Sequence, residues 1–154
     1  MSALSNSYLP YFSNEPSISA GELFSNDNQT IVIPDTSPVL LICPTTLSSS
    51  EFFISPSPGI LQFLGSSTNH FMISYTICLT STVDVLNSIY INLRGLLLNS
   101  GSNTITTTSA FVRELTGSTI ENLNYGDMIS LYIGSSAPNT TNCFNVKLSA
   151  YELL

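Results

Sequence analysis

The sequence predicts an all-β fold, a single-domain sandwich of the jelly-roll kind built from about eight to ten short strands. Three observations lead to this prediction. Short runs alternate apolar and polar residues, Gly, Pro, Asn and Ser clusters separate the runs, and no stretch keeps a 3.6-residue period between helix caps. The 154 residues are enough for one domain with a substantial core, and no repeat or break in composition divides them.

Residues 70–80 carry the clearest strand signal, and we expect them at the centre of the sandwich. Large apolar side chains occupy every second position from Phe71 to Leu79, and the positions between them hold small or weakly polar side chains. Neither set contains a charged residue, and the single ionisable imidazole nearby is His70, at the start of the run. A strand that faces water usually has charged outer residues, so we expect protein on both faces of this one.

The sequence predicts that residues 1–30 form an irregular N-terminal tail and that residues 31–154 form the jelly-roll domain. Pro10 and Pro16 interrupt any period in the tail. An apolar and aromatic cluster flanks Pro10 on both sides, and its members are Tyr8, Leu9, Tyr11 and Phe12. Two interpretations remain open: the tail folds back on its own domain, or it is a docking peptide for a neighbouring protein.

Beyond the tail, short strands follow one another with turn signals between them. The expected ranges are 30–34, 38–44, 51–55, 60–64, 85–94, 96–98, 104–112, 128–133 and 143–153. In the expected strand 104–112, Ile105 and Phe111 lie on one face. In the last, the alternation puts Phe144 on the same face as Val146. Residues 135–142 are expected to form a long polar loop, and Glu114 and Glu121 to flank a solvated loop.

The composition excludes several classes of partner. Charged residues make up only 8% of the chain against about 25% in an average soluble domain, so Ser, Thr and Asn must solvate the surface or copies of the chain must cover it. A net charge of −7, with only three basic residues, argues against binding to nucleic acid or to an anionic membrane. No run approaches the ~18 apolar residues of a membrane span, and no signal peptide is recognisable at the start.

We find no pattern of residues that indicates an enzyme, a cofactor or a metal site. His70 is the single histidine, the acids are scattered, and no Gly-rich phosphate loop is present. Asp84 with Asn87 is the best calcium candidate, but calcium needs about six to eight oxygen ligands and this loop is poor in carboxylates. Two interpretations are open for the cysteines, which are Cys43, Cys78 and Cys143. Either they are buried as small apolar side chains, or they form cross-links between subunits.

Four elements, in order, resemble the jelly rolls of tumour necrosis factors and complement globular heads. The run 71–80 is similar to the family strand that reads Gly-x-Tyr-x-Ile-Ser-Tyr, although Phe71 stands where the family has Gly-x-Tyr. The run 89–96 resembles the next strand, 123–131 the Leu-x-x-Gly-Asp-x-Ile-x-Leu element, and 146–154 the closing strand. Together the likeness covers about residues 30–154.

Within that superfamily the chain looks most like bacterial spore-surface proteins, the exosporium basal-layer protein and the head of the collagen-like exosporium glycoprotein. The shared features are the low charge, the Ser/Thr/Asn surface and a Leu-Pro-x-Phe tail at residues 9–12. This implies a non-enzymatic structural module on the spore surface, with other coat proteins as partners. The alternative is a receptor- or glycan-binding head of a viral capsid or fibre, on a virion surface, or a cytokine-like ligand, with recognition in loops such as 135–142.

The resemblance also implies a homotrimer in which one sheet packs around a threefold axis. On the expected register the side chains toward the axis are Met72, Ser74, Thr76, Cys78 and Tyr151. A single β-bulge would reverse this assignment, because each residue inserted moves the following side chains to the other face.

Overall fold

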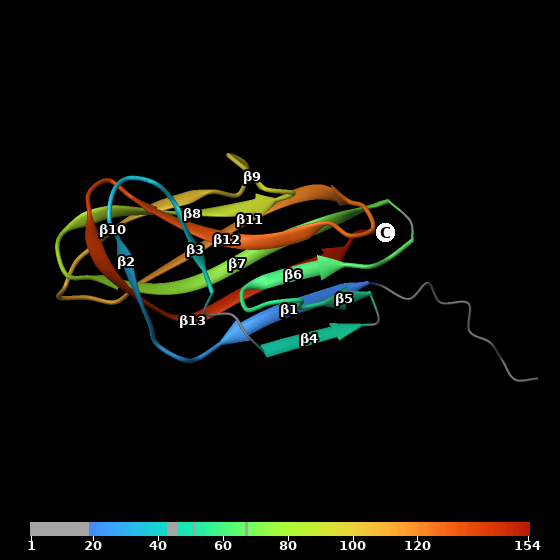
Figure 1. The fold of residues 1–154 in the computed structure, drawn as a ribbon, viewed down its shortest axis with the longest axis horizontal. Coiled ribbons are helices and arrows are strands. Elements are labelled where there is room, and N and C mark those ends of the chain that lie inside the picture. Colours follow the sequence, from blue (N-terminus) through green and yellow to red (C-terminus); the bar gives the residue numbers. More distant parts are fainter. Residues whose placement is uncertain (1–18, 43–45, 51, 67) are drawn as a thin grey trace, which may run out of the picture.

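The computed structural model describes residues 19–42, 46–50, 52–66 and 68–154. Over these ranges the chain forms thirteen β-strands in two antiparallel sheets packed face to face, and no helix (Figure 1). The predicted all-β sandwich is therefore confirmed, with more strands than the sequence predicts. In the same ranges, no helix has the length and apolar character needed to span a membrane.

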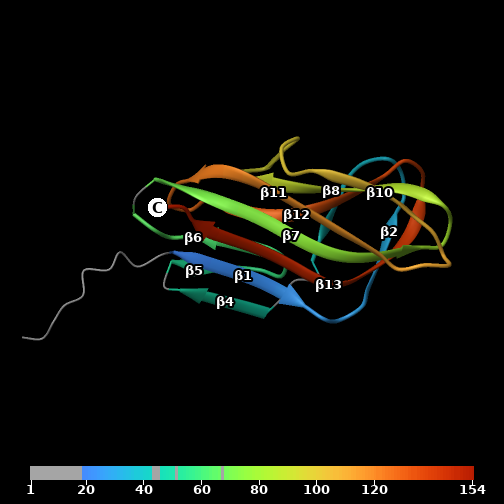
Figure 2. The same cartoon turned by 180° about the vertical axis from the view of Figure 1, so that it is seen from behind.

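The first sheet has six strands, and β7 lies inside it between β11 and β13. The strand order is β11-β7-β13-β1-β4, with β2 paired to the first part of β13. The strands are β11 (Arg113–Leu123), β7 (Asn69–Ser81), β13 (Asn139–Glu152), β1 (Ala20–Ser25), β4 (Thr46–Ser50) and β2 (Gln29–Ile33). Figure 2 shows β7, β13, β1 and β4 side by side.

The second sheet has seven strands in the order β10-β8-β12-β6-β5, with β3 paired to β12 and β9 to β8. Its strands are β10 (Asn103–Thr107), β8 (Val85–Leu93), β12 (Met128–Ser135), β6 (Ile60–Phe63), β5 (Phe53–Ile54), β3 (Val39–Leu41) and β9 (Leu96–Leu97). All described pairings in both sheets are antiparallel, and among them only β5–β6 and β8–β9 join strands that are consecutive in the chain, so most neighbours in each sheet come from distant parts of the sequence.

The core lies between the sheets and is organised along the inner face of β7. The alternate residues of this strand from Phe71 to Leu79 are at most 2% exposed. Phe71 meets the rings of Phe53 and Phe63 at centroid distances of 5.8 and 4.9 Å, in edge-to-face geometry. The predicted central strand is confirmed, because the alternation puts Phe71, Ile73 and the following alternate residues to Leu79 on the face that the other sheet covers.

A buried cluster of polar side chains joins the two sheets at one end. Asn87 of the second sheet donates through Nδ2 to Ser81 Oγ at 2.8 Å and to Thr107 Oγ1 at 2.7 Å. Ser81 Oγ lies 2.9 Å from Thr141 Oγ1, and both of these residues belong to the first sheet. All four residues are at most 3% exposed. Because buried hydroxyls and amides are costly without partners, the cluster favours one alignment of the sheets.

The predicted tail of 30 residues is too long, because β1 occupies Ala20–Ser25 and β2 begins at Gln29. β1 alternates Leu23, a core residue, with Glu22 and Phe24, and it pairs with β13 on one side and β4 on the other. β4 consists of Thr, Leu and three Ser, a composition that does not predict a strand. Pairing with β1 forms these strands, and such long-range pairing is invisible in local composition.

The expected solvated loop between Glu114 and Glu121 is wrong, because these residues lie in β11. β11 pairs with β7 over its whole length. Gly117 sits opposite Tyr75, and a Cβ added there would overlap the Tyr75 ring and the carbonyl oxygen of Gly101. A glycine in mid-strand weakens the sequence signal, and here it is the residue that the packing requires.

Two further boundaries differ from the prediction. The strand expected over 104–112 ends at Thr107, and Phe111 is 66% exposed instead of sharing a buried face with Ile105. The expected loop 135–142 is short, because β12 runs to Ser135 and β13 begins at Asn139. Thr and Asn at the start of β13 join the sheet through β2 and β7, against their polar composition.

A β-bulge in β13 corrects the predicted face of Phe144. The register against β7 shifts between Phe144 and Lys147, and Asn145 adopts φ 49°. Cys143 is buried before the bulge and Val146 after it, so Phe144 faces away from Val146, not with it. Tyr151 lies after the bulge, and its side chain is on the outer face, as predicted.

The aromatic cluster gives a prediction about stability. Replacing Phe71 with Ala should lower the free energy of unfolding by about 3–5 kcal/mol, since it removes a fully buried ring and leaves a cavity. Urea unfolding at a fixed protein concentration measures this change. The control is Phe111→Ala, whose ring is exposed and should change stability by about 0.5 kcal/mol or less. Equal losses for the two variants would contradict the described core.

The bulge gives a second prediction. Asn145→Val should cost about 1–2 kcal/mol, because a β-branched residue fits a left-handed backbone poorly. Asn145→Gly removes the same amide but accepts the positive φ, so it should cost clearly less. Thermal or urea unfolding of the two variants side by side decides the matter, and a larger loss for Gly than for Val would refute the bulge.

Candidate assembly surface

The outer face of the six-stranded sheet carries four of the predicted interface residues on β7. Met72, Ser74, Thr76 and Cys78 alternate with the core residues of this strand and therefore point away from the second sheet. Tyr151 lies on β13 directly opposite Met72. The structure therefore brings the five residues together on one face.

An apolar row crosses this face at one end. Ile120 of β11 pairs with Met72 of β7, and Met72 pairs with Tyr151 of β13. These three side chains, which we call the apolar row, are 61%, 39% and 40% exposed. Directly paired residues on one face have Cβ atoms about 4.5–5.5 Å apart, so the row forms a continuous apolar strip.

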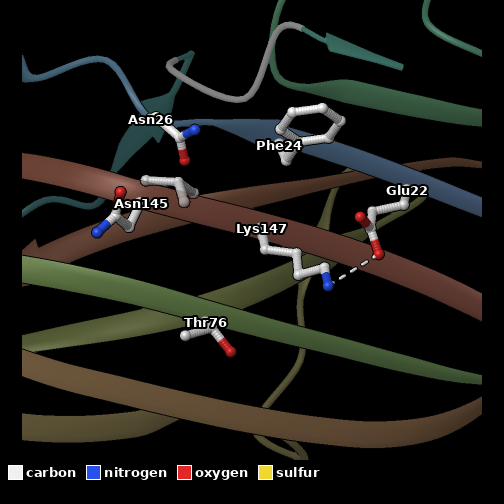
Figure 3. A pocket seen from close by; sticks show the side chains of 7 residues that line it. Glu22, Phe24, Asn26, Thr76, Asn145 and Lys147 are labelled. Carbon is white, nitrogen blue, oxygen red and sulfur yellow. Dashed lines mark ion pairs between the residues drawn. The ribbon is translucent and has the colours of Figure 1, made fainter. Parts of the chain in front are cut away.

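The next two rows are polar but carry little net charge. Ser118, Ser74 and Ser149 occupy paired positions on β11, β7 and β13. Beyond them, Lys147 Nζ forms an ion pair with Glu22 Oε2 at 3.1 Å (Figure 3). Ser149 and Tyr151 also donate to Glu22 Oε2, each at 3.3 Å. The one carboxylate and the one amine at the middle of the face thus neutralise each other.

A groove of about 460 Å³ opens beside the bulge on the same face. Figure 3 shows the side chains of Phe24, Asn26 and Asn145 around it, with Thr76 across from Lys147. The bulge lengthens β13 here by a residue, so the face is concave between β1 and β7. Its lining combines one aromatic ring with amides and an ion pair.

Cys78 lies at the far end of the face with its thiol free and nearly buried. Burial raises the pKa of this thiol, the negative charge of Glu114 raises it further, and a hydrogen bond from Asn145 lowers it in part. Because the thiolate is the reactive form, this environment makes Cys78 slow to cross-link. Cys143 is fully buried, and Cys43 lies outside the described residues.

The other residues singled out from the sequence do not assemble into a catalytic or metal centre. His70 is exposed at the start of β7, and no group of three or more His, Cys, Asp or Glu side chains gathers among the described residues. Asp84 is exposed, whereas the amide of the calcium candidate Asn87 is buried among hydroxyls. The predicted docking residues Tyr8, Leu9, Tyr11 and Phe12 lie outside the described residues.

Asp127 instead shapes a corner of the fold. Its carboxylate accepts from Arg94 Nε at 2.9 Å and Arg94 Nη2 at 2.6 Å, and also from the Asn124 backbone amide. Arg94 donates in addition to the carbonyl of Asn122. The bond to Asp127 raises the pKa of Arg94, which keeps the guanidinium charged. This clamp ties the turn before β12 to the end of β8.

Sequence reasoning missed three residues of the face, Ile120, Glu22 and Phe24. Ile120 belonged to a stretch interpreted as a loop, because Gly117 and Glu121 interrupt the apolar alternation between the buried residues Leu115 and Leu123. Glu22 and Phe24 were hidden because β1 fell within the supposed tail.

Comparison with known proteins shows the fold. No protein-family model matches the chain, and no curated protein matches it in sequence. Murine APRIL at pH 5.0 superposes with a TM-score of 0.58 at 13% identity, over 88% of this chain and 99% of that one. Eiger TNF from S. frugiperda gives 0.58 at 10% identity, over 89% and 93%. The globular domain of zebrafish complement 1qA gives 0.54 at 12%, over 85% and 94%.

The chain therefore has the jelly-roll fold of tumour necrosis factors and complement globular heads, as the strand motifs predicted. Identities of this size show the fold alone. They leave the particular likeness to spore-surface proteins as a hypothesis.

The surroundings of Cys78 lead to a prediction about its pH dependence. Alkylation of Cys78 by iodoacetamide at pH 8 should be slower than that of an unstructured peptide thiol, because its pKa is raised. Glu114→Gln removes the negative charge and should shift the rate–pH profile toward lower pH. Mass spectrometry of the modified peptide follows both rates. Faster alkylation of Cys78 than of the reference peptide would contradict the described environment.

Proposed function

We propose that this protein is a non-enzymatic structural module that forms a homotrimer through the outer face of its six-stranded sheet. The trimer is a building unit of a proteinaceous surface layer, for which the spore exosporium is the best candidate. The observation that carries the proposal is the apolar row Ile120–Met72–Tyr151, on a face whose central charges, Lys147 and Glu22, pair with each other. Such a face gains free energy when a copy covers it.

The size of the face suits a stable contact. β7 has 13 residues, which at about 3.3 Å each is about 43 Å. Five strands at a spacing of about 4.8 Å span roughly 19 Å, so the face offers roughly 800 Å². A specific interface buries about 800 Å² on each partner, so this face is large enough for one.

The electrostatics also favour self-association. Copies that each carry a net charge of −7 repel one another, but Lys147 neutralises Glu22 where the copies would meet. The ion pair also bonds to Ser149 and Tyr151, so little charge remains to be desolvated. Acids such as Asp35 and Asp84 lie on exposed loops outside this face.

The assignment to a spore surface is supported by the sequence, through the Leu-Pro-x-Phe tail at residues 9–12 and the low charge. Other coat proteins would then be the partners of the trimer. The test is fractionation of spores from a host that expresses a tagged copy. Recovery with the exosporium layer supports the assignment, and recovery with the mother-cell debris alone contradicts it.

One observation favours the second candidate, a ligand- or glycan-binding head. The groove of about 460 Å³ beside Phe24 lies within the size range of small-molecule sites. The groove opens on the same face as the apolar row, so a trimer built on this face would cover at least part of it. The two candidates therefore predict opposite exposures for Phe24 in the native assembly.

The oligomeric state tests the first proposal. Native mass spectrometry of the wild-type chain should give three times the mass of one subunit. Ile120→Lys should shift the equilibrium to single subunits, because it places a charge at one end of the apolar row, on its most exposed side chain. A buried unpaired charge costs several kcal/mol, which corresponds to a loss in association of at least about a hundredfold.

The matched control is Leu86→Lys, on a strand of the second sheet with a side chain that is 48% exposed on the opposite face. It should leave the mass unchanged. A wild-type chain that is a stable monomer at micromolar concentration, or a Leu86→Lys chain that dissociates as fully as Ile120→Lys, refutes the proposed interface.

A further inference from the structure

The seven-stranded sheet contains no charged residue in any of its strands. The six-stranded sheet, by contrast, carries acids or bases on β1, β11 and β13. The outer face of the seven-stranded sheet, on the other side of the sandwich from the apolar row, therefore offers only hydroxyls, amides and apolar groups. A ligand recognised through its charge finds no counter-charge there, so this face suits a neutral one.

Two tyrosines lie next to each other in the middle of this face. Tyr90 of β8 pairs directly with Tyr132 of β12, and directly paired residues have Cβ atoms about 4.5–5.5 Å apart. Both alternate with core residues of their strands and therefore point outward, and both are half-buried. Within the described residues, the ring-to-ring contacts join phenylalanines alone, so neither tyrosine ring is covered by another ring.

Gly134 makes room for the ring of Tyr90. A Cβ added at Gly134 would lie 3.2 Å from Tyr90 Cε2 and 3.6 Å from Pro38 Cγ. Gly134 stands two residues after Tyr132, diagonally across the strand pair from Tyr90. The edge of the Tyr90 ring therefore reaches over the backbone of β12, which holds this aromatic surface in place before any ligand arrives.

Two polar side chains beside the tyrosines have no partner. Asn92 of β8 and Ser130 of β12 form the next pair on the same face, and they are 8% and 7% exposed. Neither side chain hydrogen-bonds to another described residue, although polar groups buried to this degree normally find a partner. The fully enclosed unpaired atoms of the described chain belong to Gln29 and Asn87, so Asn92 and Ser130 still reach the surface. Their open hydrogen-bonding positions face outward, toward a ligand.

Aromatic rings beside open amides and hydroxyls suit a sugar. A pyranose ring has a face of C–H groups, which packs on the face of an aromatic ring, and a rim of hydroxyls that both donate and accept. The amide of Asn92 has both donors and acceptors, and the hydroxyl of Ser130 likewise, so they match such a rim. A neutral sugar chain needs no counter-charge, and the face provides none.

Other classes of ligand fit this face less well. A nucleic acid is disfavoured because the chain has a net charge of −7 and the face has no basic side chain. A peptide added as a strand needs a free sheet edge, whereas the backbones of β8 and β12 are paired on both sides. A second copy of the chain would desolvate Asn92 and Ser130, which costs free energy unless it supplies matching polar groups.

We infer that the outer face of the seven-stranded sheet binds a neutral polysaccharide through Tyr90, Tyr132, Asn92 and Ser130. We call these four residues the tyrosine platform. The inference goes beyond the proposed assembly function, because the platform lies on the opposite sheet from the apolar row and stays open in the trimer. Several platforms in one assembly would bind a long polysaccharide more tightly than one platform alone.

Affinity electrophoresis of the full-length chain tests the inference. Native gels are cast with dextran, a β-glucan, a mannan or glycol chitin, and mobility is compared with a gel that contains no polymer. At least one of these neutral polymers should retard the protein, whereas anionic polygalacturonate should not. Retardation by none of the four neutral polymers overturns the inference, and retardation by polygalacturonate alone does so too.

Variants locate the contact. Tyr90→Ala and Tyr132→Ala should each weaken the apparent affinity at least about tenfold, because each removes a stacking surface. Asn92→Ala leaves both rings in place and should weaken it as well, which gives a test that does not remove an aromatic side chain. The matched control is Tyr125→Ala, a tyrosine that is 71% exposed in the turn before β12 and should leave retardation unchanged. Urea unfolding verifies that each variant is folded, and equal losses for Tyr125→Ala and the platform variants refute the site.

The same gels separate the platform from the groove and from the proposed trimer. Phe24→Ala should leave retardation intact, and a loss there with no loss in the platform variants would move the sugar to the groove and refute the inference. A platform variant that lowers the native mass without changing retardation refutes it too, since the face would then contact another copy. Ile120→Lys changes the other sheet and should still be retarded, so the trimer can fail while this inference stands.

Discussion

The structure depends on the alternation of side chains along β7. The alternate residues Phe71 to Leu79 point into the sandwich, so the positions between them, Met72 included, form the outer face. β7 lies between β11 and β13, and this outer face is the middle of a broad sheet. Because the outer residues are small or apolar, water solvates them poorly. The same pattern that builds the core therefore creates the surface through which we propose the protein associates.

The central strand could be predicted from sequence because its pattern is local and uninterrupted. β11 could not, since Gly117 and Glu121 occupy inward-side positions where an apolar residue would have signalled a strand. Its pairing with β7 compensates for this composition. The face of Phe144 depended on the bulge at Asn145, and nothing in the order of residues marks where the backbone turns left-handed. The strand motifs were enough to predict the fold, whereas only some residues of the outer face of the six-stranded sheet could be predicted.

Charge is used sparingly and locally in this molecule. Arg94 and Lys147, two of the three basic side chains, each form an ion pair with an acid from a distant part of the sequence. One pair fixes a corner, and the other neutralises the middle of the sheet face. Among the described residues, the acids outside these two ion pairs lie partly on loops, as Asp35 and Asp84 do, and partly in strands, as Glu114 and Glu121 do in β11.

The pairing of β1 with β13 has a consequence for biosynthesis. Ser19 and Glu152, which bond to each other, are 133 positions apart, so the first strand of the sheet must wait for nearly all of the domain to be translated. Until then β1, β2 and β4 have no sheet to join, and their apolar side chains stay accessible to chaperones. The six-stranded sheet, and with it the proposed assembly face, is therefore complete only once nearly the whole domain has been synthesised.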